Sequence, residues 1–449
     1  MSFTGLVFAA LFSCTLIMAL IRHPIFGLYA YLLAFYGYPP ERWWGEGLPD
    51  LRWSLIAAGV TLIGTLRLER NPDQAKWYNN SAAILLIVFT VWLWIQMNWA
   101  LSPDDHSFFT TLYTKYLVLF YLLYRIVSDE KTVFHFSLAH VVGCAYYGWL
   151  AYSTARGGRF ENIGGPGVDG ASAFAAHMST GLIFAGVLLF RTRGFVRIMV
   201  LLAIPFILNA IILTQSRGGF LGLMAGGLVV LYLWPPEYRK RTYMSATMGV
   251  ILFFILAHDV FLDRMATIMN AVEREEMDTS AEARWELIDA QWKMFRLRPV
   301  LGSGHRGTVI LSEQYLDDKW MSSQGGRSSH NTSMTVLVEQ GIPGTIIYIV
   351  LAAWAAIRLR KLKSWDSRDP PTSLGLHRAA IGGALTSILV AGQFADYIKL
   401  EVTIWCIVLL VVISRLTKDA ISNESDVATV RSEIGVRNKA TVSRKQSAI

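Results

Sequence analysis

The amino-acid sequence predicts an all-α, polytopic membrane protein with about 12 transmembrane helices. Of its 449 residues, 53% are hydrophobic and only 16% are charged, and uncharged stretches about as long as a bilayer core is thick recur along the chain. A soluble chain of this length would need far more polar surface. Because no linker divides the chain, residues 1–415 are predicted to form one transmembrane domain, followed by a disordered cytoplasmic tail over 416–449.

Thirteen apolar stretches are candidates for the membrane-spanning helices. In chain order they are 3–21, 24–38, 53–66, 81–99, 108–125, 133–153, 172–190, 196–214, 218–234, 242–262, 332–357, 379–395 and 402–415. The first two are joined by only Arg22-His23-Pro24, so one of this pair could tilt, insert halfway or close a hairpin. The first stretch has neither the basic start nor the cleavage site of a signal peptide, so we expect it to stay in the mature protein.

Short basic connections predict the orientation of these helices, because loops rich in Lys and Arg stay in the cytoplasm. Three such loops agree in parity, and they contain Arg191/Arg193/Arg197, Arg239/Lys240/Arg241 and Arg358/Arg360/Lys361/Lys363. The C-terminal tail falls on the same side. The opposite side, which is the periplasm in a bacterium, receives loops 39–52, 100–107, 154–171, 263–331 and 396–401.

The long loop 263–331 contains a predicted amphipathic helix. In the stretch RWELIDAQWKMF, Trp285, Ile288, Trp292 and Phe295 share one helical face. Two tryptophans on an apolar face are typical of a helix at the membrane interface, where it would cover one end of the bundle. The alternative is a helix that packs against protein, since periodicity alone does not separate the two.

The sequence predicts no metal site and no cofactor. The acidic pairs Asp104-Asp105 and Asp317-Asp318 have no further ligands at metal-binding spacing, and we interpret them as solvated loop charge. The cysteines lie inside apolar stretches without a C-x-x-C pair, which argues against a disulfide framework and a thiolate metal site. They are predicted to be small packing residues: Cys14, Cys144 and Cys406.

The stretch TQSRGGFLG predicts an anion site at the outer boundary. It places Arg217 between two apolar stretches, beside Gly218 and Gly219, which permit close approach of backbone or ligand. A guanidinium stays charged and binds phosphate through a planar fork. The alternative is an arginine that extends to the lipid headgroups.

Two further residues are candidates for the same site. Arg284 lies on the first turn of the amphipathic loop helix, at the height of a lipid phosphate, although it could also be a solvated surface charge. His330 lies where the outer loop becomes a membrane helix, and a neutral imidazole near pH 7 can take a proton from a hydroxyl. The alternative is an interfacial or capping histidine. Asn331 follows it as a polar contact, and Asp396 is a weaker candidate for orienting His330 or an acceptor sugar.

Together these motifs resemble the O-antigen ligase and polymerase superfamily. His330-Asn331, nine residues, Gly341, two residues and Gly344 are similar to its histidine signature, and Arg217 through Leu221 are similar to its Arg-x-x-x-Leu element. Arg284 and the stretch RPVLGSG, which includes Gly302 and Gly304, resemble the arginine and the Pro-x-x-Gly-x-Gly stretch at the end of its large periplasmic loop. The N-terminal half more loosely resembles O-glycosylation ligases of exosortase-linked systems.

This resemblance implies a fold like that of the GT-C glycosyltransferases and a periplasmic active site in the bacterial inner membrane. It implies metal-independent, inverting transfer of a glycan from undecaprenyl pyrophosphate to a hydroxyl acceptor such as lipid A-core. His330 would be the general base, Arg217 and Arg284 would bind the pyrophosphate, and Asn331, Gly302 and Gly304 would contact substrate. No nucleic acid is expected as a partner.

Two alternatives stay open. An O-antigen polymerase or a protein O-oligosaccharyltransferase would use the same donor chemistry, because acceptor recognition lies in variable loops. A transporter or flippase would need ionisable groups deep in several helices, arranged symmetrically between two related halves. The candidates for such groups form no symmetric pattern: Lys115, His140, His177 and Glu339.

Overall fold

The computed structural model describes residues 2–69, 76–155, 157–168, 170–257, 259, 261–266, 279–321, 325–364 and 374–422. These residues are built of helices, which confirms the predicted all-α class. The helices are α1 (Phe3–Ile21), α2 (Ile25–Gly37), α3 (Trp53–Thr65), α4 (Ser81–Gln96), α5 (Pro103–Ile126), α6 (Glu130–Thr154), α7 (Ala171–Leu188), α8 (Gly194–Leu213), α9 (Arg217–Leu233), α10 (Arg239–Leu256), α12 (Thr279–Leu297), α13 (Gly307–Tyr315), α14 (Thr332–Lys363), α15 (Leu374–Ala391) and a last helix over 401–422. Each of the thirteen apolar stretches corresponds to one of them.

Several of these helices can cross a membrane. Among the described residues, α1, α7, α8, α14 and α15 are both long and apolar enough, and α3, α4, α9 and part of α10 are shorter apolar helices. The chain is therefore a multi-pass membrane protein, while the number of crossings, about 12, stays a prediction. The first two stretches form separate helices that pack on each other across the turn 22–24.

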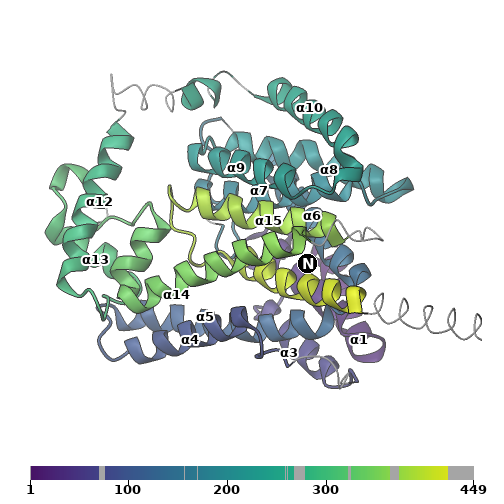
Figure 1. Cartoon of the computed structure of the whole chain (residues 1–449), viewed down its shortest axis with the longest axis horizontal. Coiled ribbons are helices and arrows are strands. Elements are labelled where there is room, and N and C mark those ends of the chain that lie inside the picture. The colour runs from purple at the N-terminus through teal and green to yellow at the C-terminus, as the bar shows by residue number, and fades with distance from the viewer. Residues whose placement is uncertain are drawn as a thin grey trace, which may run out of the picture.

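The long helices lie side by side, and α12 and α13 gather at one end of them (Figure 1). Within the bundle, α15 packs against α7 and α9, and α14 packs against α4. The core is apolar and aromatic, with Phe120 and Trp405 fully buried. Burial of such rings stabilises the packing without directional bonds.

The loops predicted to share the outer side contact one another. The buried Arg42 donates hydrogen bonds to the carbonyls of Ile163 and Gly164, which fastens loop 154–171 to loop 39–52. The backbone N–H of Leu101 donates to the carbonyl of Ser303. Loops 39–52 and 154–171 therefore lie together, and so do loops 100–107 and 263–331, as expected for loops on one side of the membrane.

The amphipathic helix is confirmed, but its two faces have different neighbours. The two tryptophans of the predicted face are exposed, Trp285 by 65% and Trp292 by 46%, whereas Ile288 and Phe295 on that face are half-buried. Another face packs against α13 and α14 through Leu287 and Met294, which are 1% exposed. The packing alternative was therefore wrong for the tryptophans. Their exposure is compatible with the predicted place at the membrane interface.

The predicted boundary of the C-terminal tail was too early. The last helix continues beyond Leu416 to residue 422, because Leu416 still packs against the core and the Thr417 hydroxyl donates to the Ile413 carbonyl. Residues 423–449 of the predicted disordered tail lie outside the described residues.

Candidate active site

The site is built on a break in α14. Gly341 has φ 64° and ψ −167°, which interrupts the helix, and a Cβ placed there would lie 2.5 Å from the carbonyl oxygen of Val300. Only glycine adopts this conformation without strain. At the break, the N–H of Ile342 donates to the carbonyl of Pro299, and the N–H of Ser303 donates to the carbonyl of Val338. The first glycine of the histidine signature, Gly341, thus packs against the RPVLGSG stretch, and the residues around it form hydrogen bonds to that stretch.

Gly302 and Gly304 make this docking possible. Both have positive φ, 67° and 79°, and a Cβ on Gly302 would lie 2.4 Å from the Glu339 carbonyl oxygen. A Cβ on Gly304 would meet Ala100 at 2.5 Å. These glycines therefore permit the close approach of other protein segments, which carry Glu339 and Ala100. Their predicted contact with substrate stays a prediction.

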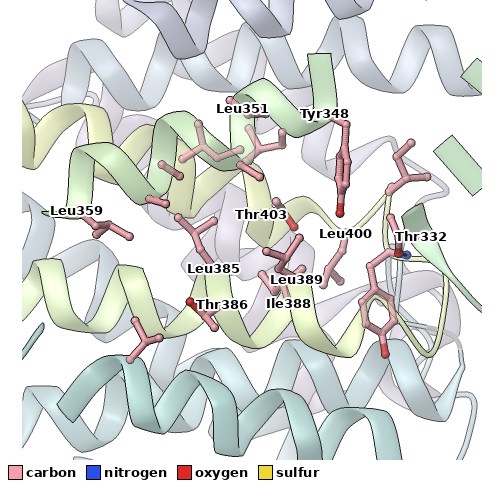
Figure 2. Close-up of a pocket in the computed structure, with 18 of the residues that line it drawn as sticks. Thr332, Tyr348, Leu351, Leu359, Leu385, Thr386, Ile388, Leu389, Leu400 and Thr403 are labelled. Carbon is pink, nitrogen blue, oxygen red and sulfur yellow. Dashed lines mark hydrogen bonds between the residues drawn. The ribbon is translucent and has the colours of Figure 1, made fainter. Parts of the chain in front are cut away.

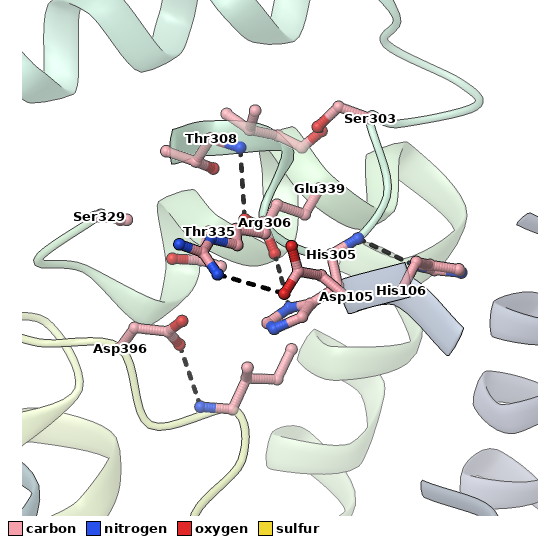
Figure 3. Close-up of polar contacts among 12 residues, drawn as sticks. Asp105, His106, Ser303, His305, Arg306, Thr308, Ser329, Thr335, Glu339 and Asp396 are labelled. Carbon is pink, nitrogen blue, oxygen red and sulfur yellow. Dashed lines mark hydrogen bonds and ion pairs between the residues drawn. The ribbon is translucent and has the colours of Figure 1, made fainter. Parts of the chain in front are cut away.

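Buried polar side chains lock the same loop in place (Figure 3). His305 Nδ1 lies 3.2 Å from Glu339 Oε2, and the N–H of Thr308 donates to Glu339 Oε1. The N–H of His305 donates to His106 Nδ1, so this nitrogen carries no proton, and His106 Nε2 donates to the Leu93 carbonyl. Glu339 therefore fastens α14 to the outer loop, a role that the sequence did not indicate.

The turn that carries His330 is held from two sides. Asn331 caps α14, because its side-chain oxygen accepts from the N–H of Met334, and its amide donates to the Gln393 carbonyl. On the other side, Gln291 of α12 donates to the hydroxyl of Ser329 at 2.7 Å. The helix that carries Arg284 is thereby tied to the residue before His330. The predicted contact of Asn331 with substrate stays untested.

The electrostatic environment of His330 is cationic. Burial and the charges of Arg284, Arg327 and Arg159 lower the pKa of His330 to about 4. All three of these charges are arginines, so the potential at the imidazole is positive. The charge of Arg284, which the sequence proposed for the same site, thus acts on His330 together with two arginines that the sequence did not single out.

Arg159 reaches this position from the loop between α6 and α7. Its Nε donates to the Thr214 carbonyl, and another guanidinium nitrogen donates to the hydroxyl of Ser172. The same Ser172 accepts, through its carbonyl, the hydroxyl of Tyr397 at 2.6 Å. Burial raises the pKa of Tyr397, and the charges of Arg159 and Arg284 oppose that rise, so both guanidinium groups also act on this residue.

Arg217 begins α9 next to these residues. Ser216 caps the helix by accepting from the N–H of Gly219, and its hydroxyl lies 3.4 Å from that of Ser172. A Cβ on Gly218 would lie 2.5 Å from Phe394, so the start of α9 packs against the loop that contains Tyr397. Arg217 is not among the three charges that act on His330. The residues flanking it nevertheless connect it to Arg159 and to this loop.

Asp396 belongs to the neighbouring polar cluster. Burial and the charge of Glu339 raise its pKa to about 6, and His305 and Lys399 act in the opposite direction. Its carboxylate accepts from the N–H of Ile398 (Figure 3). The charged groups that act on Asp396 are therefore Glu339, His305 and Lys399, and the arginines that act on His330 are not among them. A role of Asp396 toward an acceptor sugar stays a prediction.

The segment that carries most of these residues matches a known family. Residues 198–349, from α8 to the first half of α14, match the family model described as O-Antigen ligase. The chain carries an O-antigen ligase domain. Among curated proteins, none matches the chain. The O-antigen ligase domain includes Arg217, Arg284 and His330, together with the interlocking glycines.

Two of the residues around His330 lie outside the O-antigen ligase domain. Arg159 comes before it and Tyr397 after it. The sequence signal for Arg159 was weak, because the loop ARGGRFENIGG suggests only a flexible turn rich in glycine. Its position became evident only through its contacts with α7 and α8.

Proposed function

We propose that this enzyme transfers a glycan from undecaprenyl pyrophosphate to an acceptor hydroxyl on the periplasmic face of the bacterial inner membrane. The observation that carries the proposal is that the charges of Arg284, Arg327 and Arg159 all act on the imidazole of His330 and lower its pKa. Guanidinium groups on the loops next to the membrane helices suit a pyrophosphate at the edge of the lipid. A histidine among them suits proton removal from the acceptor.

In the proposed reaction, His330 takes the proton of the acceptor hydroxyl as its oxygen attacks the anomeric carbon. The bond from this carbon to the pyrophosphate oxygen breaks, and the configuration at the carbon inverts. Arg217, Arg284 and Arg159 stabilise the negative charge that grows on the leaving pyrophosphate. Loss of one such donor typically reduces kcat by about 10²- to 10³-fold.

Donor binding would also activate the base. With a pKa of about 4, His330 is neutral at pH 7 but only weakly basic. A bound pyrophosphate neutralises the arginine charges that, together with burial, depress this pKa. The pKa of His330 then rises toward the ordinary range of a histidine, where proton transfer at pH 7 is most efficient.

An apolar cavity beside the site supports a lipid-linked donor. It has a volume of about 400 Å³ and extends from Thr332 and Tyr397 along α14 to Leu359 and Arg360. Tyr348 and Leu351 of α14 face Leu385 and Leu389 of α15 across it (Figure 2). Since Thr332 follows His330-Asn331, the cavity begins beside the proposed pyrophosphate site. An isoprenoid chain attached to that pyrophosphate could enter it without exposing its methylene groups to water.

The test is a transfer assay with the purified protein, a lipid-linked oligosaccharide donor, and either lipid A-core or a second donor as acceptor. A glycan joined to lipid A-core is the expected product. A lengthening polymer without an acceptor-linked product would show a polymerase, and transfer to a peptide hydroxyl alone would show a protein glycosylation enzyme. No transfer to any hydroxyl acceptor would overturn the proposal.

A further inference from the structure

A second polar cluster lies inside the bundle, formed by four buried side chains. Tyr36 of α2, His140 and Cys144 of α6, and His177 of α7 are between 0% and 4% exposed. His140, Cys144 and His177 each direct one potential ligand atom toward the others, and these atoms all lie within 4.8 Å of one another. From this geometry we infer a binding site for Zn²⁺, separate from the proposed transfer site and independent of it.

The distances from the sulfur resemble those around a tetrahedral zinc ion. Typical Zn–S and Zn–N bonds imply a sulfur–nitrogen separation of about 3.6 Å in a tetrahedral site. Cys144 Sγ lies 3.8 Å from His140 Nδ1 and 3.7 Å from the Tyr36 hydroxyl oxygen. That oxygen is 2.5 Å from His140 Nδ1 and 3.0 Å from His177 Nε2. The Tyr36 oxygen therefore lies at contact distance from one sulfur and two imidazole nitrogens, and outward shifts of this oxygen and the nitrogens would admit the ion between the four atoms.

The hydrogen bonds leave His140 Nδ1 as an acceptor that faces this centre, where it now accepts the hydroxyl proton of Tyr36. The Thr180 hydroxyl donates its only proton to the carbonyl of His177, so at its contact with His140 Nε2 it accepts. His140 Nε2 therefore carries the proton, and Nδ1 is unprotonated. A ring N–H that donates to an oxygen, with the other nitrogen facing the centre, is the arrangement found in histidines that bind metals.

Two glycines make room for the ligands. A Cβ on Gly181 would lie 2.5 Å from Cys144 Sγ, and a Cβ on Gly143 would lie 2.1 Å from the ring of Tyr36. Larger residues at these positions would displace the sulfur or the phenol ring. The helices α6 and α7 thus approach closely at the cluster itself, and this fixes the ligand positions.

Charge balance favours an ion of charge +2 in this apolar surrounding. Binding would release the thiol proton of Cys144 and the hydroxyl proton of Tyr36, leaving one thiolate, one phenolate and two neutral imidazoles around Zn²⁺. The site would then carry no net charge, which avoids the cost of an uncompensated buried charge. This revises the expectation from sequence that Cys144 is only a packing residue.

The test uses the full chain, purified in detergent without a polyhistidine tag and stripped with a chelator. After incubation with Zn²⁺ and gel filtration, elemental analysis should find about one Zn²⁺ per chain. Replacement by Co²⁺ should give the thiolate-to-cobalt absorption of a tetrahedral site. This second measurement needs no variant, so it does not depend on the folding of one.

Variants then locate the ion. Cys144→Ser should lose the cobalt band, while Cys406→Ser, which alters another buried cysteine, should keep it. Thr180→Val removes the acceptor of the His140 N–H and should weaken Zn²⁺ binding by about 10- to 100-fold. The inference fails if the wild-type chain holds no more Zn²⁺ than its buffer, or if Cys144→Ser retains the cobalt band. Either result would leave the cluster as a hydrogen-bonding network.

Discussion

The guanidinium charge of Arg284 acts on the imidazole of His330, although one residue lies on the amphipathic helix α12 and the other precedes α14. Gln291, two turns after Arg284, donates to Ser329, the residue before His330. This hydrogen bond fixes α12 against the turn. The outer-loop helix is thus part of the proposed site, and each of its elements can be tested separately.

His330→Ala should lower kcat for glycan transfer by at least about 10²-fold, because the acceptor proton then has no positioned base. Transfer is measured as acceptor-linked product. His135→Ala is the matched control and should transfer at the wild-type rate. It alters a half-buried histidine near the start of α6, whereas the loop that carries Arg159 follows the end of that helix. Wild-type activity in His330→Ala would show that this residue is not the base.

Arg159→Ala should lower kcat by about 10²- to 10³-fold, as expected when a donor to the leaving group is lost. Arg159→Lys should recover only part of the activity, since a lysine keeps the charge but not the planar fork. Lys293→Ala removes an exposed charge on α12 that pairs with Asp289, and it serves as the control. If Arg159→Ala changes thermal stability but not kcat, then the residue only holds its loop.

The pH dependence of transfer should differ between the free enzyme and the donor complex. The low pKa of His330 predicts that kcat/KM for the donor falls only as pH drops through about 4, because the imidazole is then protonated. The fall in kcat should occur at higher pH, since the bound pyrophosphate offsets the arginine charges. In Arg284→Gln, the residual kcat/KM should fall at higher pH than in the wild type. Coincident profiles for kcat and kcat/KM would contradict activation of the base by the donor.

Gly341→Ala should destabilise the protein by about 1–3 kcal/mol, because the new Cβ requires an unfavourable backbone conformation and meets the Val300 carbonyl. Thermal unfolding in detergent measures the loss. Gly227→Ala is the control, since that glycine lies within α9 and a Cβ there has no neighbour within 4 Å. This control should be at least as stable as the wild type. Equal melting temperatures for Gly341→Ala and the wild type would argue against the interlocking of the two motifs.

Ala352→Trp should fill part of the apolar cavity and raise KM for a donor with a long isoprenoid chain. A donor with a short chain should be affected much less, because it does not reach that part of α14. The neighbouring Ala353 is exposed and does not line the cavity, so Ala353→Trp is the matched control. Equal effects of Ala352→Trp on both donors would exclude the cavity as the lipid site.

The sequence alone predicted the helices and singled out three candidate site residues. A backbone segment in lipid must form its hydrogen bonds within itself, so an apolar stretch of sufficient length becomes a helix. This depends on local composition alone, and every predicted stretch corresponds to a helix in the structure. His330, Arg217 and Arg284 followed from motif spacing, and the segment that contains them matches the O-antigen ligase family. Their roles in transfer remain predictions.

Only the tertiary structure showed which distant residues meet. Arg159 joins the arginines around His330 because Arg42, Thr214 and Ser172 hold its loop, and no local pattern encodes such contacts. Likewise His140, Cys144 and His177 were separate polar residues in the sequence, and the packing of α6 on α7 brings them together. Helix formation is decided by neighbours along the chain, whereas the convergence of charged and metal-binding side chains depends on how the helices pack.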